Sequence, residues 1–273
     1  MSQPKIFVVN LESSADRREF IGSQLEKLDL LYEIFPAVDG RKVPQEELDE
    51  YYDGKAAVAF FGRELTRGEI GCAWSHLNIY RWMVDNQIPE ALVLEDDVIL
   101  TQDLKEILER RNLFPSDWEL VFVSHNNAVS SVWGHIPIYD KYKLVKFVEH
   151  PNWTSGYLIT LEGAKKLLSL GYPIRMPADW LTGNRLDRNV RIYGIKPVVI
   201  PQNKEFQETI SGRFELNQSN WFGEKAEKKG LLNLAISFYR GLKRKSRFFK
   251  NIADGIKNMR RIKYIFAQFR RVR

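Results

Sequence analysis

The sequence predicts an α/β fold, a sheet layered against helices, for most of the chain. Short apolar runs with the composition of buried strands alternate with longer segments whose apolar residues recur at helical spacing. In addition, 44% of the 273 residues are hydrophobic and 12% are aromatic, which is enough for a substantial core.

The first half of the chain predicts three strands and four helices. Residues 5–10 are a continuous apolar run, and residues 13–16 supply side chains suited to capping the next helix. Asp39-Gly40 is a turn that ends the second strand, and Pro44 suits a helix start. In order, we expect a strand at 5–10, a helix to about residue 28, a strand at 31–38, helices at 44–52 and 68–84, a strand within 91–100 and a helix at 104–111.

The second half predicts a strand at 118–123, then an irregular segment at 124–150 of the kind that often binds substrate. A strand at 154–160 and a helix at 161–170 follow. Residues 190–200 predict two short strands separated by Gly194.

Charge divides the chain into two predicted parts, a body at 1–223 and a tail at 224–273. The body has a formal net charge of −7 and the tail one of +13. Apolar residues of the tail recur at helical spacing with basic residues between them, which predicts a basic amphipathic helical segment. Such a segment is suited to an anionic membrane surface; nucleic-acid binding and packing on the body are the alternatives.

Cys72 is the single cysteine, which excludes an intrachain disulfide. No apolar stretch reaches the length of about 18 residues that crosses a bilayer, and residues 1–10 lack the pattern of a secretory leader. We therefore expect a reducing, cytoplasmic location.

Three consecutive acids, Glu95, Asp96 and Asp97, follow the buried apolar run at 91–94. A buried strand does not tolerate unpaired carboxylates, because desolvating each charge costs several kcal/mol. We therefore expect the strand to end here. Adjacent acids at a strand end are best explained by a bound divalent cation, and a solvated acidic turn is the alternative.

Other candidate residues follow the same logic, each with a simpler alternative. Arg17 and Arg18 lie near the start of the helix that follows the first strand. Because helix N-termini favour anions, they face a phosphate group, or alternatively they are solvated helix residues. His76 is a base, a metal ligand or a core histidine. Asp179 is a general base or an N-cap. Gln207 lies in a polar loop from which it reaches the metal or the phosphates.

Five blocks occur in order: VVNLESSADRR, LTRGEIGCAWSH, ALVLEDDVIL, WTSGYLIT and PADW. Together they resemble glycosyltransferase family 25, the bacterial lipooligosaccharide galactosyltransferases and their distant collagen-modifying relatives. The resemblance covers roughly residues 4–220, and PADW departs from a more common PVD pattern. It implies a GT-A-like single-domain α/β/α sandwich, here followed by the basic helical extension.

The resemblance also implies site residues. Asp97 and Glu95 are the implied metal ligands, and the cation is Mn²⁺ or Mg²⁺. Gln207, from its polar loop, is a further candidate metal ligand. Asp96 is implied to contact the ribose or sugar hydroxyls. The set implied to hold the UDP-sugar donor comprises Asn10, Leu11, Arg17, Arg18, Ser75, His76, Glu95 and Asp96.

The resemblance implies inverting, metal-dependent transfer of a hexose, usually galactose, from a UDP-sugar. The predicted acceptor is a lipid-linked lipooligosaccharide or lipopolysaccharide core, and the predicted product has a β-linkage. Asp179 is the predicted base, and the predicted location is the inner face of the cytoplasmic membrane, without nucleic acid as partner. The alternatives are a glucosyltransferase of the same family, a metal-dependent nucleotidyl- or phosphotransferase, and a basic membrane or nucleic-acid adaptor.

Overall fold

Short aliphatic segments bounded by turn residues form the strands of one mixed sheet. The computed structural model describes residues 3–126, 128–131, 133–148, 150–183 and 190–201. The described strands are β1 (Lys5–Asn10), β2 (Glu33–Pro36), β3 (Glu90–Glu95), β4 (Leu120–Phe122), β5 (Ile136–Tyr139), β6 (Tyr142–Lys146), β7 (Gly156–Thr160) and β8 (Ile192–Lys196).

Helices connect most of these strands. The described helices are α1 (Ala15–Lys27), α2 (Gln45–Tyr51), α3 (Gly54–Phe61), α4 (Arg67–Asp85), α5 (Gln102–Glu109), α6 (Leu161–Gly171) and α7 (Ala178–Thr182), with a 3₁₀ turn, η1, at Arg111–Leu113. The longest of them, α4, begins at a capping box in which Thr66 and Glu69 satisfy each other's backbone N–H groups.

The strand order is β2-β1-β3-β7-β4-β8-β6-β5. β1 lies between β2 and β3 and is parallel to both, so the carboxyl ends of these three strands share one edge of the sheet. β7 is antiparallel to β3 on one side and to β4 on the other. The amino end of β7 therefore meets the carboxyl end of β3.

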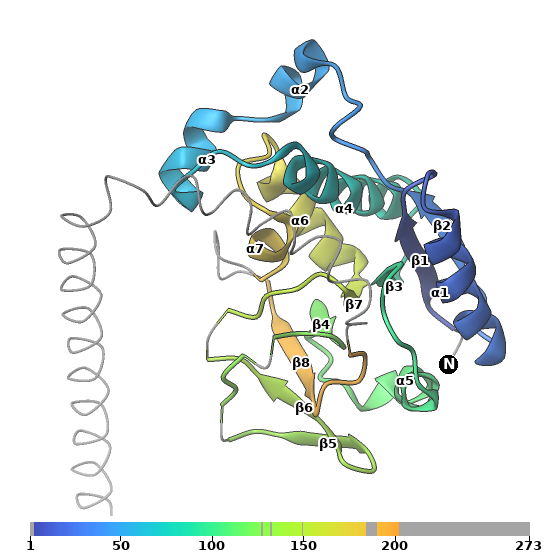
Figure 1. Cartoon of the computed structure of the whole chain (residues 1–273). Helices are drawn as coiled ribbons and strands as arrows, with labels where there is room; N and C mark the ends of the chain where they lie inside the picture. The colour runs from blue at the N-terminus through green and yellow to red at the C-terminus, as the bar shows by residue number, and fades with distance from the viewer. Residues whose placement is uncertain (1–2, 127, 132, 149, 184–189, 202–273) are drawn as a thin grey trace, which may run out of the picture. The chain divides into compact units, whose positions relative to one another are not determined.

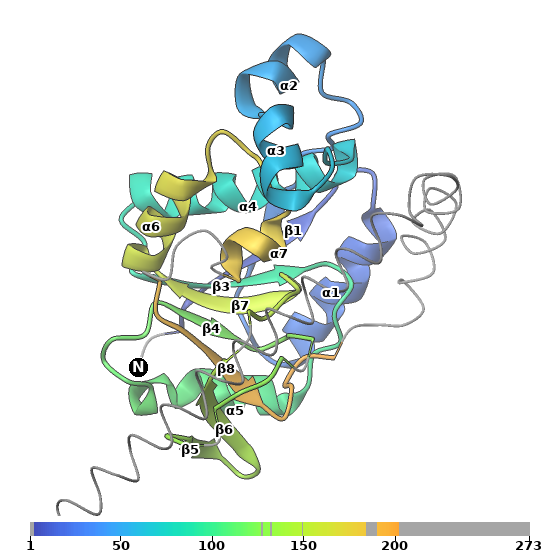
Figure 2. The same ribbon diagram turned by 90° about the vertical axis from the view of Figure 1, so that its left-hand side faces the viewer.

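Helices cover both faces of the sheet (Figures 1 and 2). Because alternate strand residues point to opposite faces, Phe7 and Val93 pack in a core with α4 and α6, whereas Ile6, Val8 and Leu92 pack in a second core with α1 and α5. The predicted α/β/α layering is confirmed.

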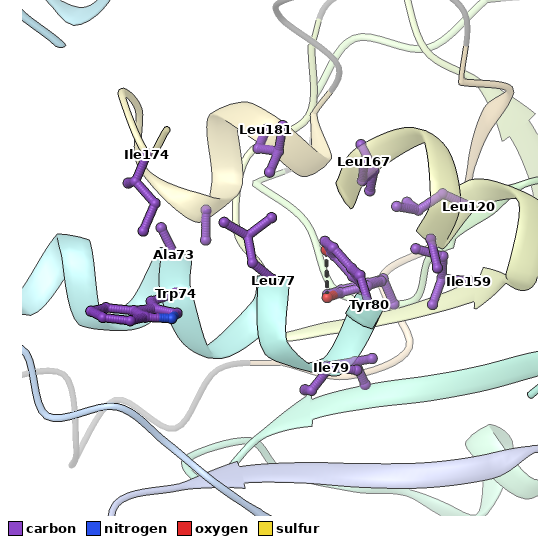
Figure 3. Close-up of a cluster of buried hydrophobic side chains, with 14 of the residues drawn as sticks. Ala73, Trp74, Leu77, Ile79, Tyr80, Leu120, Ile159, Leu167, Ile174 and Leu181 are labelled. Carbon is purple, nitrogen blue, oxygen red and sulfur yellow. Dashed lines mark hydrogen bonds between the residues drawn. The ribbon is translucent and has the colours of Figure 1, made fainter. Parts of the chain in front are cut away.

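The first core is densest along α4, where Ala73, Leu77 and Tyr80 pack against side chains of α6, α7 and the sheet (Figure 3). Burying an aliphatic side chain of this size stabilises the fold by about 1.5–3 kcal/mol. This packing fixes the position of α4 against the sheet.

The predictions for 124–150 and 190–200 were wrong in part. The segment 124–150 contains the β5–β6 hairpin, whose register shifts near Pro137. Gly194 lies inside the single strand β8 and does not separate two strands. A Cβ at Gly194 would lie 2.2 Å from the Phe147 ring, so glycine admits that ring beside the strand.

No helix in the described ranges is long and apolar enough to cross a membrane. The predicted boundary at 223/224 and the basic tail lie outside the described residues.

Two glycines bring the loop after β2 against the start of α4. A Cβ at Gly71 would lie 2.4 Å from the Val38 carbonyl oxygen and 2.6 Å from the Gly40 nitrogen. Ser75 joins the same two segments, because its hydroxyl donates to the Gly71 carbonyl at 2.7 Å and accepts from the Val38 N–H at 2.8 Å. The loop is thereby held on α4 by backbone contact.

We predict that Gly71→Ala lowers the free energy of unfolding by about 2 kcal/mol, because backbone must shift to admit the methyl group. Gly68→Ala is the matched control: its nearest neighbouring atom would lie 4.0 Å away, and alanine favours a helix by up to about 1 kcal/mol. Urea denaturation measures both variants. Equal stability of the two would contradict this account of the contact.

Candidate active site

Strand register gathers the candidate residues at the carboxyl ends of β1 and β3. Val9 is paired with Glu95, so Asn10 lies beside the residues that follow β3. The Glu95 N–H donates to the Ser155 carbonyl at 3.1 Å, which places Thr154 beside the Glu95 side chain. The prediction that β3 ends at the acids is confirmed: it ends at Glu95, and Asp96 and Asp97 lie in the following turn.

Asp96 is held by β1 and α1. Asn10 Nδ2 donates to Asp96 Oδ2 at 2.7 Å, and an Arg17 guanidinium nitrogen donates to Asp96 Oδ1 at 3.1 Å. Burial raises the pKa of Asp96, an effect that the contacts with Asn10 and Arg17 only partly oppose. Arg18, the next helix residue, projects about 100° further around α1.

Asp97 is the least compensated of the three acids. Burial and the negative charges of Glu95 and Asp96 raise its pKa to about 7, although Arg17 lies 3.7 Å away. Within the described residues, its Oδ1 is buried without a hydrogen-bond partner. An oxygen ligand with this surplus of negative charge is what a hard divalent cation prefers, so the residues fit the implied metal.

Glu95 points toward α4 and the segment before β7. The Thr154 hydroxyl donates to Glu95 Oε1 at 2.5 Å, and His76 Nε2 lies 3.8 Å from the same oxygen. Burial raises the pKa of Glu95, but the contacts with His76 and Thr154 outweigh that effect, so the pKa is lowered overall. Glu95 is therefore held as a carboxylate.

The two α4 residues predicted to bind the donor differ in their surroundings. Ser75 is buried and bonded to backbone on both sides, as described above. His76 is 1% exposed, and its Nδ1 lies 2.7 Å from the Tyr157 hydroxyl. Its Nε2 faces Glu95, so His76 reaches the acids directly and Ser75 holds the loop next to them.

A pocket of about 180 Å³ opens beside these acids, and it brings the predicted base close to them. Glu95, Cys72, Thr154 and Asp179 all line it. Asp179 is the second residue of α7, and Pro177, not Asp179, occupies the N-cap position. The N-cap alternative for Asp179 is therefore wrong, and the residue lines the pocket.

A second pocket, of about 300 Å³, lies after the carboxyl ends of β1 and β2. Leu11 lines it together with Ala37, Asp39 and Lys42. Because β1, β2 and β3 are parallel neighbours, both pockets lie at the same edge of the sheet. Ligands of open α/β sheets gather at such an edge. Gln207 lies outside the described residues.

Sequence reasoning did not identify Trp153 and Thr154 as parts of the site. Trp153 has a φ of +80°, a left-handed conformation that is rare for a residue with a side chain, and its indole is partly exposed at the pocket. Strained backbone of this kind clusters at functional sites. No sequence pattern predicts it, because the conformation depends on where β7 enters the sheet.

Comparisons with known proteins agree on one family. Residues 3–182 match the sequence model described as Glycosyltransferase family 25 (LPS biosynthesis protein). Procollagen galactosyltransferase 1-A of Xenopus laevis is 31% identical over 66% of this chain and 30% of its own length. Procollagen galactosyltransferase 2 of Mus musculus is 32% identical over 62% of this chain and 28% of its own length. The chain thus spans less than a third of these relatives.

Among solved structures, a Drosophila β-1,4-galactosyltransferase 7 complex with manganese, UDP-Gal and xylobiose is 9% identical, with a TM-score of 0.35. The similarity covers 76% of this chain and 74% of that one. Likeness at this level carries no conclusion about the chemistry of this chain.

We predict that Asp97→Asn stabilises the metal-free protein at pH 8 by about 2 kcal/mol. The native pKa of about 7 lies above the ordinary value of 3.8. At a pH between these two values the folded state therefore binds more protons at Asp97 than the unfolded state does. Stability attributable to Asp97 therefore falls as pH rises from about 4 to about 7. The gain in the variant should shrink as the pH is lowered toward 4.

Thermal unfolding in the presence of a chelator measures this effect. Asp29→Asn is the control, because that side chain is 98% exposed and its removal leaves the site intact. A lower melting temperature for Asp97→Asn at pH 8 would show that the acid is compensated in the metal-free protein.

Proposed function

This chain belongs to glycosyltransferase family 25, and from that premise we propose that it transfers galactose from UDP-galactose to an oligosaccharide acceptor with inversion. One observation carries the proposal: Glu95, at the acidic end of β3, and Asp179 line the same pocket. Inverting transfer requires a stabilised leaving group and a base on opposite sides of the reacting carbon. Glu95, which belongs to the strand-end acid cluster, and the separate carboxylate of Asp179 in one pocket offer protein groups for both.

The donor half of the proposal rests on the edge formed by β1, β2 and β3. The pocket lined by Leu11 is proposed to receive the nucleoside, and Asn10 and Arg17 orient Asp96 toward the ribose or sugar hydroxyls. Asp97 and Glu95 are proposed to hold Mn²⁺ or Mg²⁺, which when bound supplies Lewis-acid stabilisation of the leaving diphosphate. The names of the relatives, procollagen galactosyltransferases, favour galactose over glucose.

The acceptor half rests on Asp179. Its carboxylate is proposed to accept the proton of the attacking acceptor hydroxyl, the role of a general base. Attack on the face opposite the leaving group converts an α-linked donor into a β-linked product. The partly exposed indole of Trp153 on the same pocket offers a flat apolar surface to a sugar ring.

The acceptor is proposed to be a lipid-linked core oligosaccharide of the lipopolysaccharide type, in line with the description of the matching family. The basic segment 224–273, with its net charge of +13, is proposed to hold the enzyme on the anionic inner face of the cytoplasmic membrane. Each Lys or Arg near such a surface contributes about 1 kcal/mol.

We predict that Asp179→Asn lowers the transfer rate from UDP-galactose by about 10²–10⁴-fold, because the variant cannot accept the acceptor proton. UDP affinity in the presence of Mn²⁺, measured by calorimetry, should change by less than about threefold, since Asp179 does not contact the donor in this proposal.

Glu162→Gln is the matched control, because Glu162 also occupies the second position of its helix, α6, but lies at the surface. It should retain the wild-type rate. Full activity of Asp179→Asn would show that Asp179 is not the general base. A parallel loss of UDP affinity would show that Asp179 binds the donor. Faster transfer from UDP-glucose than from UDP-galactose in a donor screen would contradict the proposed donor.

For the membrane proposal, we predict that replacing Lys243, Arg244, Lys245 and Arg247 together by Gln weakens binding to anionic vesicles by about two to three orders of magnitude. Co-sedimentation with vesicles of phosphatidylglycerol and phosphatidylcholine measures it, and vesicles of phosphatidylcholine alone are the control. Unchanged binding to anionic vesicles would exclude this role for the basic segment.

A further inference from the structure

We propose that Cys72, His76 and Glu95 form a zinc site in the wall of the Asp179 pocket, beside the hard-cation site at Asp97 with which it shares Glu95. One ligand atom from each of the three residues lies within 4.8 Å of the other two. Zinc binding at this site is independent of the proposed sugar transfer, because it does not require the chain to act on a nucleotide sugar.

Helix geometry and strand register bring the three residues together. Cys72 and His76 are four residues apart on α4, so their side chains project from the same face of the helix, one turn apart. That face lies against the carboxyl end of β3, where Glu95 is the last strand residue. The contacts of Gly71 and Ser75 with the loop after β2 fix this end of α4.

His76 is oriented as a metal ligand. Its side chain is 1% exposed, and among the described residues its Nε2 has no hydrogen-bond partner. A buried ring nitrogen without a partner is costly, by about 1–3 kcal/mol. Nε2 points toward Glu95 Oε1, 3.8 Å away, so a bound metal would give this nitrogen the partner that the described residues do not supply.

Two tyrosine hydroxyls support this orientation of the ring. His76 Nδ1 lies 2.7 Å from the Tyr157 hydroxyl, which lies 2.8 Å from the Tyr80 hydroxyl. When Nδ1 donates to Tyr157 and Tyr157 donates to Tyr80, the lone pair of the imidazole is on Nε2, facing the site. Ligating histidines in metal sites are fixed in this way by their other nitrogen. Thr154 fixes the third ligand by donating to Glu95 Oε1.

The donor set selects the metal. One thiolate, one imidazole and one carboxylate suit Zn²⁺, whereas Mg²⁺ and Mn²⁺ prefer oxygen ligands alone. Zinc bonds of about 2.0–2.3 Å at tetrahedral angles place ligand atoms roughly 3.3–3.6 Å apart. The 3.8 Å between Nε2 and Oε1 exceeds this by a few tenths of an ångström, and the Cys72 sulfur lies within 4.8 Å of both atoms. On binding, the Cys72 thiol releases its proton to solvent and becomes a thiolate.

The fourth position of the metal faces the pocket, because Cys72 and Glu95 both line it. Three protein ligands with one open position leave room for water there. Glu95 is also the second proposed ligand of the donor cation, so zinc at this site withdraws it from that cation. This last consequence rests on the proposed function, whereas zinc binding itself does not.

Cobalt titration of the full chain tests the site, with Co²⁺ as the spectroscopic probe for Zn²⁺. Cys72 is the only cysteine, so a cobalt–thiolate absorption band must arise from it. We expect one Co²⁺ per chain with this band, displaced by one equivalent of Zn²⁺. Cys72→Ser should abolish the band, and Glu95→Gln should weaken Co²⁺ binding at least tenfold while keeping the shape of the side chain.

Asp97→Asn is the matched control, because it removes a neighbouring acid that the zinc site does not use. It should keep the band and the affinity of the wild type. Absence of the band in the wild-type chain would overturn the proposal, as would wild-type affinity in Glu95→Gln. Loss of the band in Asp97→Asn would also overturn it, because the thiolate site and the donor-cation site would then be one site. Cobalt binding with the thiolate band in a chain that transfers no sugar would support the zinc site and contradict only the proposed function.

Discussion

Negative charge at the carboxyl end of β3 is the constraint on which the rest of the site depends. Three successive carboxylates follow a strand that is buried on both faces, and each requires a partner. Asn10 and Arg17 hold Asp96, while Thr154 and His76 hold Glu95. Asp97 keeps a buried oxygen without a partner and has a pKa raised to about 7 by burial and by its acidic neighbours. This residual negative charge makes the edge of the sheet suited to a divalent cation.

The placement of β7 converts that edge into a pocket. Because β7 runs antiparallel between β3 and β4, its amino end delivers Trp153 and Thr154 beside Glu95. Helix α4 adds Cys72 to the lining of the pocket and α7 adds Asp179. His76 of α4 is buried, with its Nε2 3.8 Å from Glu95 Oε1. Close backbone contact at Gly71 keeps α4 in register with these groups. The proposed hard-cation site and the proposed zinc site thus share Glu95, which can coordinate only one of the two metals fully at a time.

The sequence predicted the features that depend on local pattern. The first strand, the helix that becomes α4 and the end of β3 at the acids follow from apolar periodicity and from the cost of burying charge. The hairpin at β5 and β6 was missed because Pro137 and a register shift interrupt its alternation. Gly194 predicts a break between two strands, but in the structure it lies within β8 and admits the ring of Phe147. Trp153 and Thr154 were missed because their role depends on the insertion of β7 between distant strands.

Anomalous diffraction at the manganese edge, from crystals grown with Mn²⁺ and UDP, tests the central claim that this acidic strand end binds the donor cation. We expect one manganese peak within about 2.0–2.6 Å of an Asp97 carboxylate oxygen, in contact with the diphosphate. A bound UDP with no manganese at Asp97, or a manganese held instead by Cys72 and His76, would contradict the account.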